Sequence, residues 1–311
     1  MNRLLIIGCG DVALRAIPFL TRRYRVYALV RNADYCAKLR ALGVIPLIGD
    51  LDDRHSLARI SGLADAVLHY APPASIEKSP HPPPYQGEGK GGFRVVDLRT
   101  RNLLSVLSHG KLPQRLVYIS TSGVYGDCSG AWVSETRPTK AKNPRAQRRV
   151  DAENQIRNWA KRNRVNASIL RVPGIYAADR LPLKRLQQGT PAIVDNEDSY
   201  SNHIHADDLA RISVAALYKA KPCRVYHTSD DSRLKMGEYF DQVADANGLP
   251  RVPRVSRDEA QRVLSPMLLS FVNESRRLTN DRMKRELKVK LRYPTVADGL
   301  GRGSADVLVG N

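Results

Sequence analysis

The sequence predicts an α/β protein: a Rossmann-like, doubly wound parallel sheet with a smaller C-terminal α+β substrate domain. Short apolar, β-branched runs alternate with longer amphipathic runs, which is the pattern of parallel strands joined by helices. A glycine-containing turn follows the first strand, and after Arg171 the alternation gives way to short elements and prolines. In such a sheet the ligand crevice lies beyond the carboxyl ends of the strands.

The elements follow in order. Strands are predicted at 3–7, 25–30, 44–48, 65–69, 115–119 and 166–171. Helices between them are predicted at 11–22, 33–42, 94–108 and 146–162. The tail predicts a helix from about Asp207, a strand near 224–228 and a helix near 235–247. We therefore expect two domains: an NAD(P)-binding domain over 1–171, rejoined by about 201–229, and a smaller substrate-side domain from 172–200 and 230–311.

One segment interrupts this order. Residues 79–92, SPHPPPYQGEGKGG, are rich in proline and glycine and lack apolar periodicity, which predicts a flexible loop insertion after the fourth strand. A tolerated insertion is favoured over a lid for the nearby cofactor site.

Composition favours a cytoplasmic protein without membrane contact. A chain of 311 residues can bury a sizeable core without a disulfide or a metal. No C-x-x-C pair or histidine at ligand spacing accompanies the cysteines, so neither a disulfide framework nor a metal site is expected. Asp11 and Arg15 interrupt the opening apolar stretch, which argues against a signal peptide, and no apolar run has the length of a membrane span.

The charge indicates anionic ligands. A net charge of +19 and a pI of about 10.0 favour partners such as dinucleotides or sugar nucleotides. Nucleic acid is not expected, because no interleaved aromatics, zinc-finger spacing or RNA-recognition signature accompanies the basic residues.

The first strand runs into a G-x-G-x-x-A turn that opens a helix. Its residues are Gly8, Cys9, Gly10, Asp11, Val12 and Ala13. The first glycine permits the tight turn, the second lets the backbone approach a pyrophosphate, and the alanine allows close helix packing. The free amides at the start of the helix then receive the phosphates. A turn that serves packing only is the alternative.

The ends of the next strands supply further candidate cofactor residues. Arg31 stands where an NAD-specific site would carry a carboxylate, and an arginine there can stack on adenine and pair with a 2′-phosphate, which favours NADP over NAD. Asp50, with Leu51 beside it, follows the third strand and can accept a hydrogen bond from the adenine amino group. Ala71 and Pro72 follow the fourth strand and would wall the cofactor.

These motifs together resemble the extended and atypical short-chain dehydrogenase/reductases, that is, the NAD-dependent epimerase/dehydratase family, and above all its uncharacterised bacterial members. The matching segments are GCGDVA at 8–13, GDLDD at 49–53, LVYISTSGVYGD at 116–127, LRVPGIY at 170–176 and NHIHADDLA at 202–210. The resemblance implies a nicotinamide cofactor, which Pro173 would also contact, and a homodimer formed by two helices that flank the sheet.

The resemblance assigns Thr121 to hydrogen-bonding the reacting oxygen of the substrate, with capping of the turn as the alternative. In the family's dehydratases the next two residues are an acid pair, whereas here they are Ser122 and Gly123. Neither can protonate a leaving hydroxyl as a carboxylic acid would, so dehydratase chemistry is disfavoured. By its position in this motif, Ser122 is assigned to the substrate.

The family's Y-x-x-x-K pair is replaced by arginines. Alignment on Ala152 and Glu153 places Arg145 at the tyrosine and Arg149 at the lysine. A guanidinium stays protonated and cannot shuttle a proton as hydride moves. Arg149 can still hold the ribose hydroxyls, and Arg145 can bind a substrate phosphate or carboxylate, with a solvated basic helix face as the alternative for both.

Two tyrosines and two histidines complete the candidates. Tyr125 and Tyr176 are expected in loops at the same edge of the sheet, Tyr125 as a candidate catalytic group and Tyr176 against the substrate. His203 and His205 would share a face on a strand, but the entry to a helix capped by Asp207 or Asp208 is favoured over a metal pair.

The leading function is an NAD(P)-dependent oxidoreductase or epimerase-type enzyme for a small polar substrate, with a nucleotide sugar as one candidate. The alternative is a non-catalytic NAD(P)-binding sensor or scaffold, marked by the loss of the tyrosine.

Overall fold

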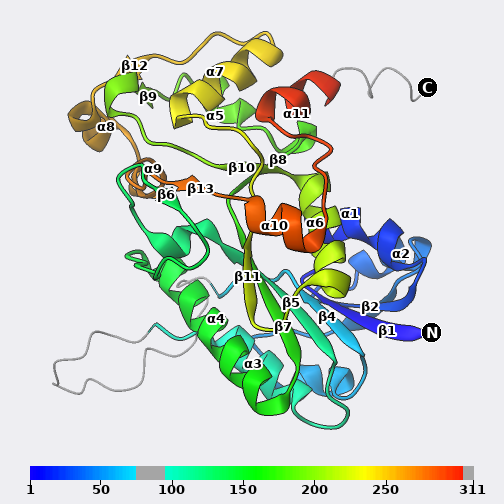
Figure 1. The fold of residues 1–311 in the computed structure, drawn as a ribbon. Coiled ribbons are helices and arrows are strands. Elements are labelled where there is room, and N and C mark those ends of the chain that lie inside the picture. Colours follow the sequence, from blue (N-terminus) through cyan, green and yellow to red (C-terminus); the bar gives the residue numbers. More distant parts are fainter. Residues whose placement is uncertain (75–94, 304–311) are drawn as a thin grey trace, which may run out of the picture.

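A seven-stranded parallel sheet forms the centre of the computed structural model, which describes residues 1–74 and 95–303 (Figure 1). Its strands lie in the order β11-β7-β5-β4-β1-β2-β3, so that the chain winds outward in both directions from β1 and β4. The strands are β1 (Asn2–Ile7), β2 (Tyr24–Val30), β3 (Ile45–Ile48), β4 (Ala66–His69), β5 (Arg115–Thr121), β7 (Asn166–Val172) and β11 (Arg224–His227). The predicted fold class is confirmed, and each predicted strand is present.

Alternation along β1 explains why both faces of the sheet are covered. Leu4 and Ile6 face one core, whereas Leu5 and Ile7 face the other, because successive side chains of a strand point to opposite sides. The first core is covered by α1 (Asp11–Leu20), α2 (Tyr35–Ala41), α6 (Ala206–Lys219) and α10 (Asp281–Leu287). The second is covered by η1 (His55–Ile60), α3 (Leu98–Leu107) and α4 (Pro144–Asn163).

Helix α4 begins two residues before its predicted start. Asn143 caps it by accepting a hydrogen bond from the amide of Ala146 at 2.8 Å, and Pro144 occupies the first turn, where a missing N–H costs nothing. The predicted helix over 94–108 is present as α3, and residue 94 lies outside the described residues.

Elements outside the large sheet gather beyond its carboxyl edge (Figure 1). Three two-stranded sheets occur there: β8 (Gly174–Tyr176) with β10 (His203–His205), β9 (Ala192–Ile193) with β12 (Arg254–Val255), and β6 (Trp132–Val133) with β13 (Arg277–Leu278). The helical elements are η3 (Ser122–Tyr125), η4 (Ala178–Arg180), α5 (Leu183–Gln187), η5 (Asp195–Glu197), α7 (Met236–Ala246), α8 (Arg257–Val263), α9 (Pro266–Val272) and α11 (Val296–Gly303). The pairing of β6 with β13 joins the first part of the chain to its tail. The division into two domains stays a prediction.

His203 and His205 lie on β10, which leads directly into α6, so the expected entry to a helix is confirmed and only its expected cap is wrong. Both rings are buried and meet the ring of Tyr176 edge-on. The cap of α6 is His205 rather than Asp207 or Asp208, because its Nδ1 accepts the amide of Asp207 at 3.2 Å. Within residues 1–74 and 95–303, no group of three or more His, Cys, Asp or Glu side chains is placed to hold a metal.

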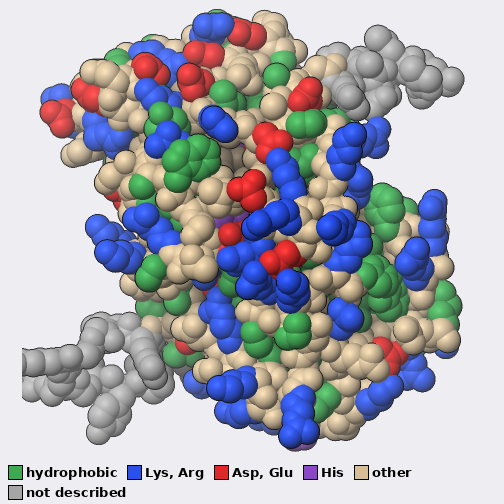
Figure 2. Space-filling model, viewed as in Figure 1, with side chains coloured by type: hydrophobic (Ala, Val, Ile, Leu, Met, Phe, Trp, Pro, Cys, Tyr) green, Lys and Arg blue, Asp and Glu red, His purple; other side chains and the backbone are tan. Residues whose placement is uncertain are grey.

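Lys and Arg side chains spread over the face shown in Figure 2, with a dense group over α6 and α10 and acidic side chains among them. Of the helices in the described part of the chain, none is both long and apolar enough to cross a membrane. The loop expected at 79–92 lies outside the described residues.

Candidate functional site

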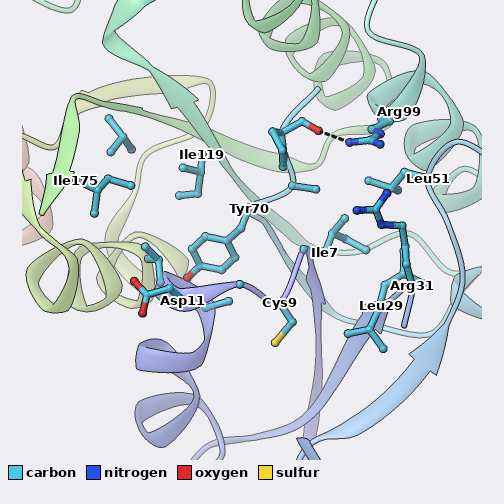
Figure 3. Close-up of a pocket in the computed structure, with 18 of the residues that line it drawn as sticks. Ile7, Cys9, Asp11, Leu29, Arg31, Leu51, Tyr70, Arg99, Ile119 and Ile175 are labelled. Atoms are coloured by element: carbon cyan, nitrogen blue, oxygen red, sulfur yellow. Dashed lines mark hydrogen bonds between the residues drawn. The ribbon is translucent and has the colours of Figure 1, made fainter. Parts of the chain in front are cut away.

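A cavity of about 600 Å³ opens at the carboxyl edge of the sheet, where the strand order reverses between β1 and β4 (Figure 3). All of the predicted cofactor residues line it. They are Gly8, Cys9, Gly10, Asp11, Val12, Ala13, Arg31, Asp50, Leu51, Ala71, Pro72, Arg149 and Pro173. The sequence motifs therefore converge on one cleft, although their contacts with a cofactor stay a prediction.

The two glycines of the turn differ in what surrounds them. Gly8 has φ +83°, and a Cβ there would lie 2.6 Å from the backbone nitrogen of Ala71, so this position requires glycine to bring β1 close to the end of β4. Gly10 precedes α1 with an extended backbone, and an added Cβ would meet no atom within 4 Å among the described residues. The open space beside Gly10 faces the start of α1, where free amides suit a pyrophosphate.

One end of the cavity carries two arginines. Arg31, Leu51 and Arg99 lie together there in Figure 3. Arg99 pairs with Asp52 at 2.6 Å and donates to the carbonyl of Pro72 at 3.2 Å. Within the described part of the chain, no hydrogen bond or ion pair engages the exposed Arg31, so its guanidinium is available for an anion. Sequence reasoning missed Arg99, because an arginine on a predicted helix gives no signal of facing a cleft.

The cavity lining is positively charged. Among the described residues, four arginines and two aspartates line it: Arg31, Arg99, Arg149, Arg180, Asp11 and Asp50. This balance suits an anionic ligand such as a dinucleotide.

The middle of the cavity is walled by Tyr70, which sequence reasoning also missed (Figure 3). Its hydroxyl lies 2.5 Å from Ser213 of α6, and burial raises the pKa of the phenol. Burial also raises the pKa of the Cys9 thiol to about 11. Both groups therefore stay protonated near neutral pH, and neither supplies a base.

Thr121 and Arg149 also line the cavity, Thr121 at the end of β5 and Arg149 against Ile119 of the same strand. The Thr121 hydroxyl accepts the amide of Gly123 at 3.2 Å, so it caps η3 while its own hydrogen remains available to a substrate oxygen. Arg149 donates through Nη1 to the carbonyl of Ile119 at 2.6 Å and to the hydroxyl of Tyr118 at 3.0 Å. These bonds hold the guanidinium against β5, and within residues 1–74 and 95–303 its Nε and Nη2 make no hydrogen bond.

The other four predicted site residues are not among the described residues that line the cavity. The expected loop placement of the two tyrosines is wrong: Tyr125 is buried in η3, and Tyr176 is buried in β8 with its hydroxyl on the carbonyl of Thr295 at 3.0 Å. Ser122 is buried as well. Arg145 is exposed and lies over the ring of Phe271, 4.7 Å from its centre.

A buried network of hydrogen bonds begins at Ser120, which lines the cavity. Glu153 accepts from Ser120 at 2.7 Å and from Arg171 at 2.7 and 3.0 Å. Burial alone would raise the pKa of Glu153, but the Arg171 guanidinium brings it below its usual range. Arg171 also donates to the Tyr125 hydroxyl at 2.7 Å, and that hydroxyl lies 2.6 Å from Nε2 of His227. Burial raises the pKa of Tyr125 to about 12 and lowers that of His227 to about 3. These hydrogen bonds therefore fix Ser120 in the cavity lining, and the tyrosine and histidine among them are uncharged.

Ion pairs lie beside the cavity at the start of α1. Asp11 accepts from Arg15 at 2.9 Å and from Arg180 at 3.0 Å. Arg15 also binds Asp179 and Asp207, each at 2.7 Å. Sequence reasoning missed Arg180, because it lies in η4, outside every sequence motif that matches the family.

Comparisons with known proteins point to one family. The model of the NAD-dependent epimerase/dehydratase family matches residues 15–227. Human dTDP-D-glucose 4,6-dehydratase is 23% identical over 246 residues, which are 73% of this chain and 68% of that protein. A UDP-glucose 4-epimerase of Mycoplasma genitalium is 27% identical over 53% of this chain and 48% of its own length.

Solved structures share the fold over nearly the whole chain. A conserved protein of unknown function from Silicibacter pomeroyi is 29% identical, with a TM-score of 0.75 over 98% of this chain and 99% of the other. A dTDP-glucose 4,6-dehydratase from Streptomyces venezuelae, solved with NAD bound, is 21% identical, with a TM-score of 0.73 over 99% and 97% of the two chains.

Proposed function

Because this chain belongs to the NAD-dependent epimerase/dehydratase family, we propose that it binds NADP(H) in the cavity and acts as an oxidoreductase or epimerase-type enzyme. The substrate is a small polar molecule, with a nucleotide sugar as the leading class, since relatives are named for dTDP-glucose and UDP-glucose. The observation that carries the proposal is the cavity itself, in which the glycine turn and Arg31 line one cleft with Thr121 and Arg149.

The residues present fit a dinucleotide. The open space beside Gly10 and the first amides of α1 would receive the pyrophosphate. Arg31 would stack on the adenine and pair with a 2′-phosphate, which an NAD-specific carboxylate at this position would repel. Asp50 would accept from the adenine amino group.

At the other end, a bound nicotinamide would supply the hydride chemistry. The Thr121 hydroxyl would donate a hydrogen bond to the substrate oxygen at the reacting carbon, since Gly123 already occupies one of its lone pairs. Arg149 would hold the ribose hydroxyls with the nitrogens that do not bond to Ile119 and Tyr118. A guanidinium is too weak an acid to take the role of the family's tyrosine, so a group other than the R-x-x-x-R pair must carry the proton of the reaction.

The test is thermal unfolding with NAD, NADH, NADP and NADPH in turn. A ligand at a hundred times its Kd stabilises a protein by about 2.7 kcal/mol, so the phosphorylated pair should raise the Tm most. Arg31→Ala should remove the difference between NADPH and NADH, whereas Arg40→Ala, an exposed arginine of α2 outside the cavity lining, should keep it. A wild-type protein that none of the four dinucleotides stabilises would refute the proposal.

A second candidate function is a non-catalytic NADP(H) sensor or scaffold. It is favoured by Arg145, which stands in place of the family's tyrosine and lies over Phe271. Thr121→Ala separates the two functions when turnover and NADPH affinity are both measured. An enzyme would lose turnover with that change, whereas a sensor would keep its affinity for NADPH. A homodimer and a cytoplasmic location stay predictions.

A further inference from the structure

A cluster of ion pairs beside the cavity joins the start of α1 to η4 and α6. Asp11, in the first turn of α1, binds Arg15 and Arg180, and Arg15 binds Asp179 and Asp207. Asp11 and Arg180 both line the cavity. The cluster therefore adjoins the helix terminus that the proposed function gives to the pyrophosphate.

The carboxylates of this cluster would repel an anion unless Arg180 offsets their charge. Three carboxylates stand against two guanidiniums, and Arg15 is shared among all three carboxylates. Asp11 already interacts favourably with the positive end of the α1 dipole, and its carboxylate would repel a pyrophosphate placed there. Arg180 is the second cation on Asp11, at 3.0 Å.

We propose that Arg180 binds the pyrophosphate of the dinucleotide and thereby couples cofactor binding to η4. The inference rests on the proposed function, since it deepens the same site. Among the described residues, Arg180 makes a side-chain hydrogen bond through Nη1 alone, and 37% of its side chain is exposed, so the guanidinium can turn from Asp11 toward a phosphate. Arginine pairs with phosphate oxygens through two parallel hydrogen bonds, and such a pair is stronger than the single hydrogen bond from Arg180 to Asp11.

The coupling runs through the elements that η4 contacts. The short helix packs against β8 and α11. Tyr176 of β8 binds the carbonyl of Thr295, and a Cβ at Gly299 of α11 would lie 2.5 Å from the Tyr176 ring, so these elements are closely packed. A phosphate that holds Arg180 therefore holds the segment that leads from β8 into the part of the chain beyond the sheet.

The experiment is a fluorescence titration with NADPH of the wild type and four variants. Arg180→Ala should raise the Kd about 10- to 100-fold, since a hydrogen bond between charged groups is lost, and Arg180→Lys should recover part of the affinity. Asp11→Asn should lower the Kd roughly two- to fivefold, because one like charge is removed. Arg251→Ala, which breaks a comparable exposed ion pair to Asp245, should leave the Kd unchanged.

Hydrogen exchange supplies a second readout that does not depend on turnover. NADPH should slow exchange over residues 174–180 in the wild type and not in Arg180→Ala, at ligand concentrations that saturate both proteins. If the wild type binds NADPH and both Arg180→Ala and Arg180→Lys have the same Kd as the wild type, the inference is overturned and the proposed function stays intact. A wild type that binds no dinucleotide would overturn both.

Discussion

Alanine at Gly8 should destabilise the fold, whereas alanine at Gly10 should weaken dinucleotide binding alone. At Gly8 the backbone has φ +83°, which costs an L residue about 1–2 kcal/mol. The new Cβ would also lie 2.6 Å from the nitrogen and 2.7 Å from the Cα of Ala71, and forcing an atom into such a packed site costs about 1–3 kcal/mol. The free energy of unfolding should therefore fall by about 2–5 kcal/mol in Gly8→Ala.

Gly10→Ala is the matched control within the same turn. Gly10 has φ −89°, and its added Cβ meets no described atom within 4 Å, so stability should change by less than about 0.5 kcal/mol. The methyl group would instead occupy space proposed for the pyrophosphate and raise the Kd for NADPH at least roughly tenfold, or about 1.4 kcal/mol.

Urea unfolding followed by tryptophan fluorescence measures the first effect, since Trp159 is buried in the core. Titration with NADPH measures the second. Equal stability of Gly8→Ala and the wild type, or equal destabilisation by both substitutions, would refute the packing argument.

Three further predictions concern the buried polar groups. Glu153→Gln should destabilise the protein by about 3–5 kcal/mol in urea unfolding, because it leaves the Arg171 charge buried with a neutral partner; an unchanged midpoint would contradict this. Tyr125→Phe should lower the free energy of unfolding by about 1–3 kcal/mol, because Arg171 and His227 each lose a hydrogen-bond partner. The Kd for NADPH should stay the same, and a higher Kd would indicate that Tyr125 belongs to the binding site after all. Stability should also fall as the pH drops from about 6.5 toward 3. The unfolded chain then binds more protons than the folded one, because burial lowers the pKa of three histidines to about 3 in the fold: His69, His203 and His227. Urea midpoints that stay constant across this pH range would exclude such linkage.

Sequence and structure agree most closely where the signal is local. The strand near 3–7 and the turn at Gly8 and Gly10 are read from neighbouring residues, because strand periodicity and the need for glycine are properties of a few consecutive positions. The same holds for Arg31, which follows directly from the end of β2 and lines the cavity as expected.

The disagreements concern the direction of side chains. Tyr125 follows the carboxyl end of β5, as a site residue should, yet its hydroxyl turns inward to Arg171 and His227. Tyr176 likewise turns to Thr295, 119 positions away along the chain. Position along the chain places a residue near the edge of the sheet, but the partners that fix its side chain come from distant segments.

By itself, the sequence determined the doubly wound sheet, the edge at which the cavity opens and the residues of the glycine turn, because each follows from short-range patterns that repeat along the chain. Only the tertiary structure decided that Arg99 and Arg180 face the cavity as well. No sequence pattern singles out Arg99 or Arg180, and they reach the cleft because α3 and η4 are packed beside it by contacts with residues far away in the chain. Charge and spacing do not encode such contacts, since they depend on how the helices cover the finished sheet.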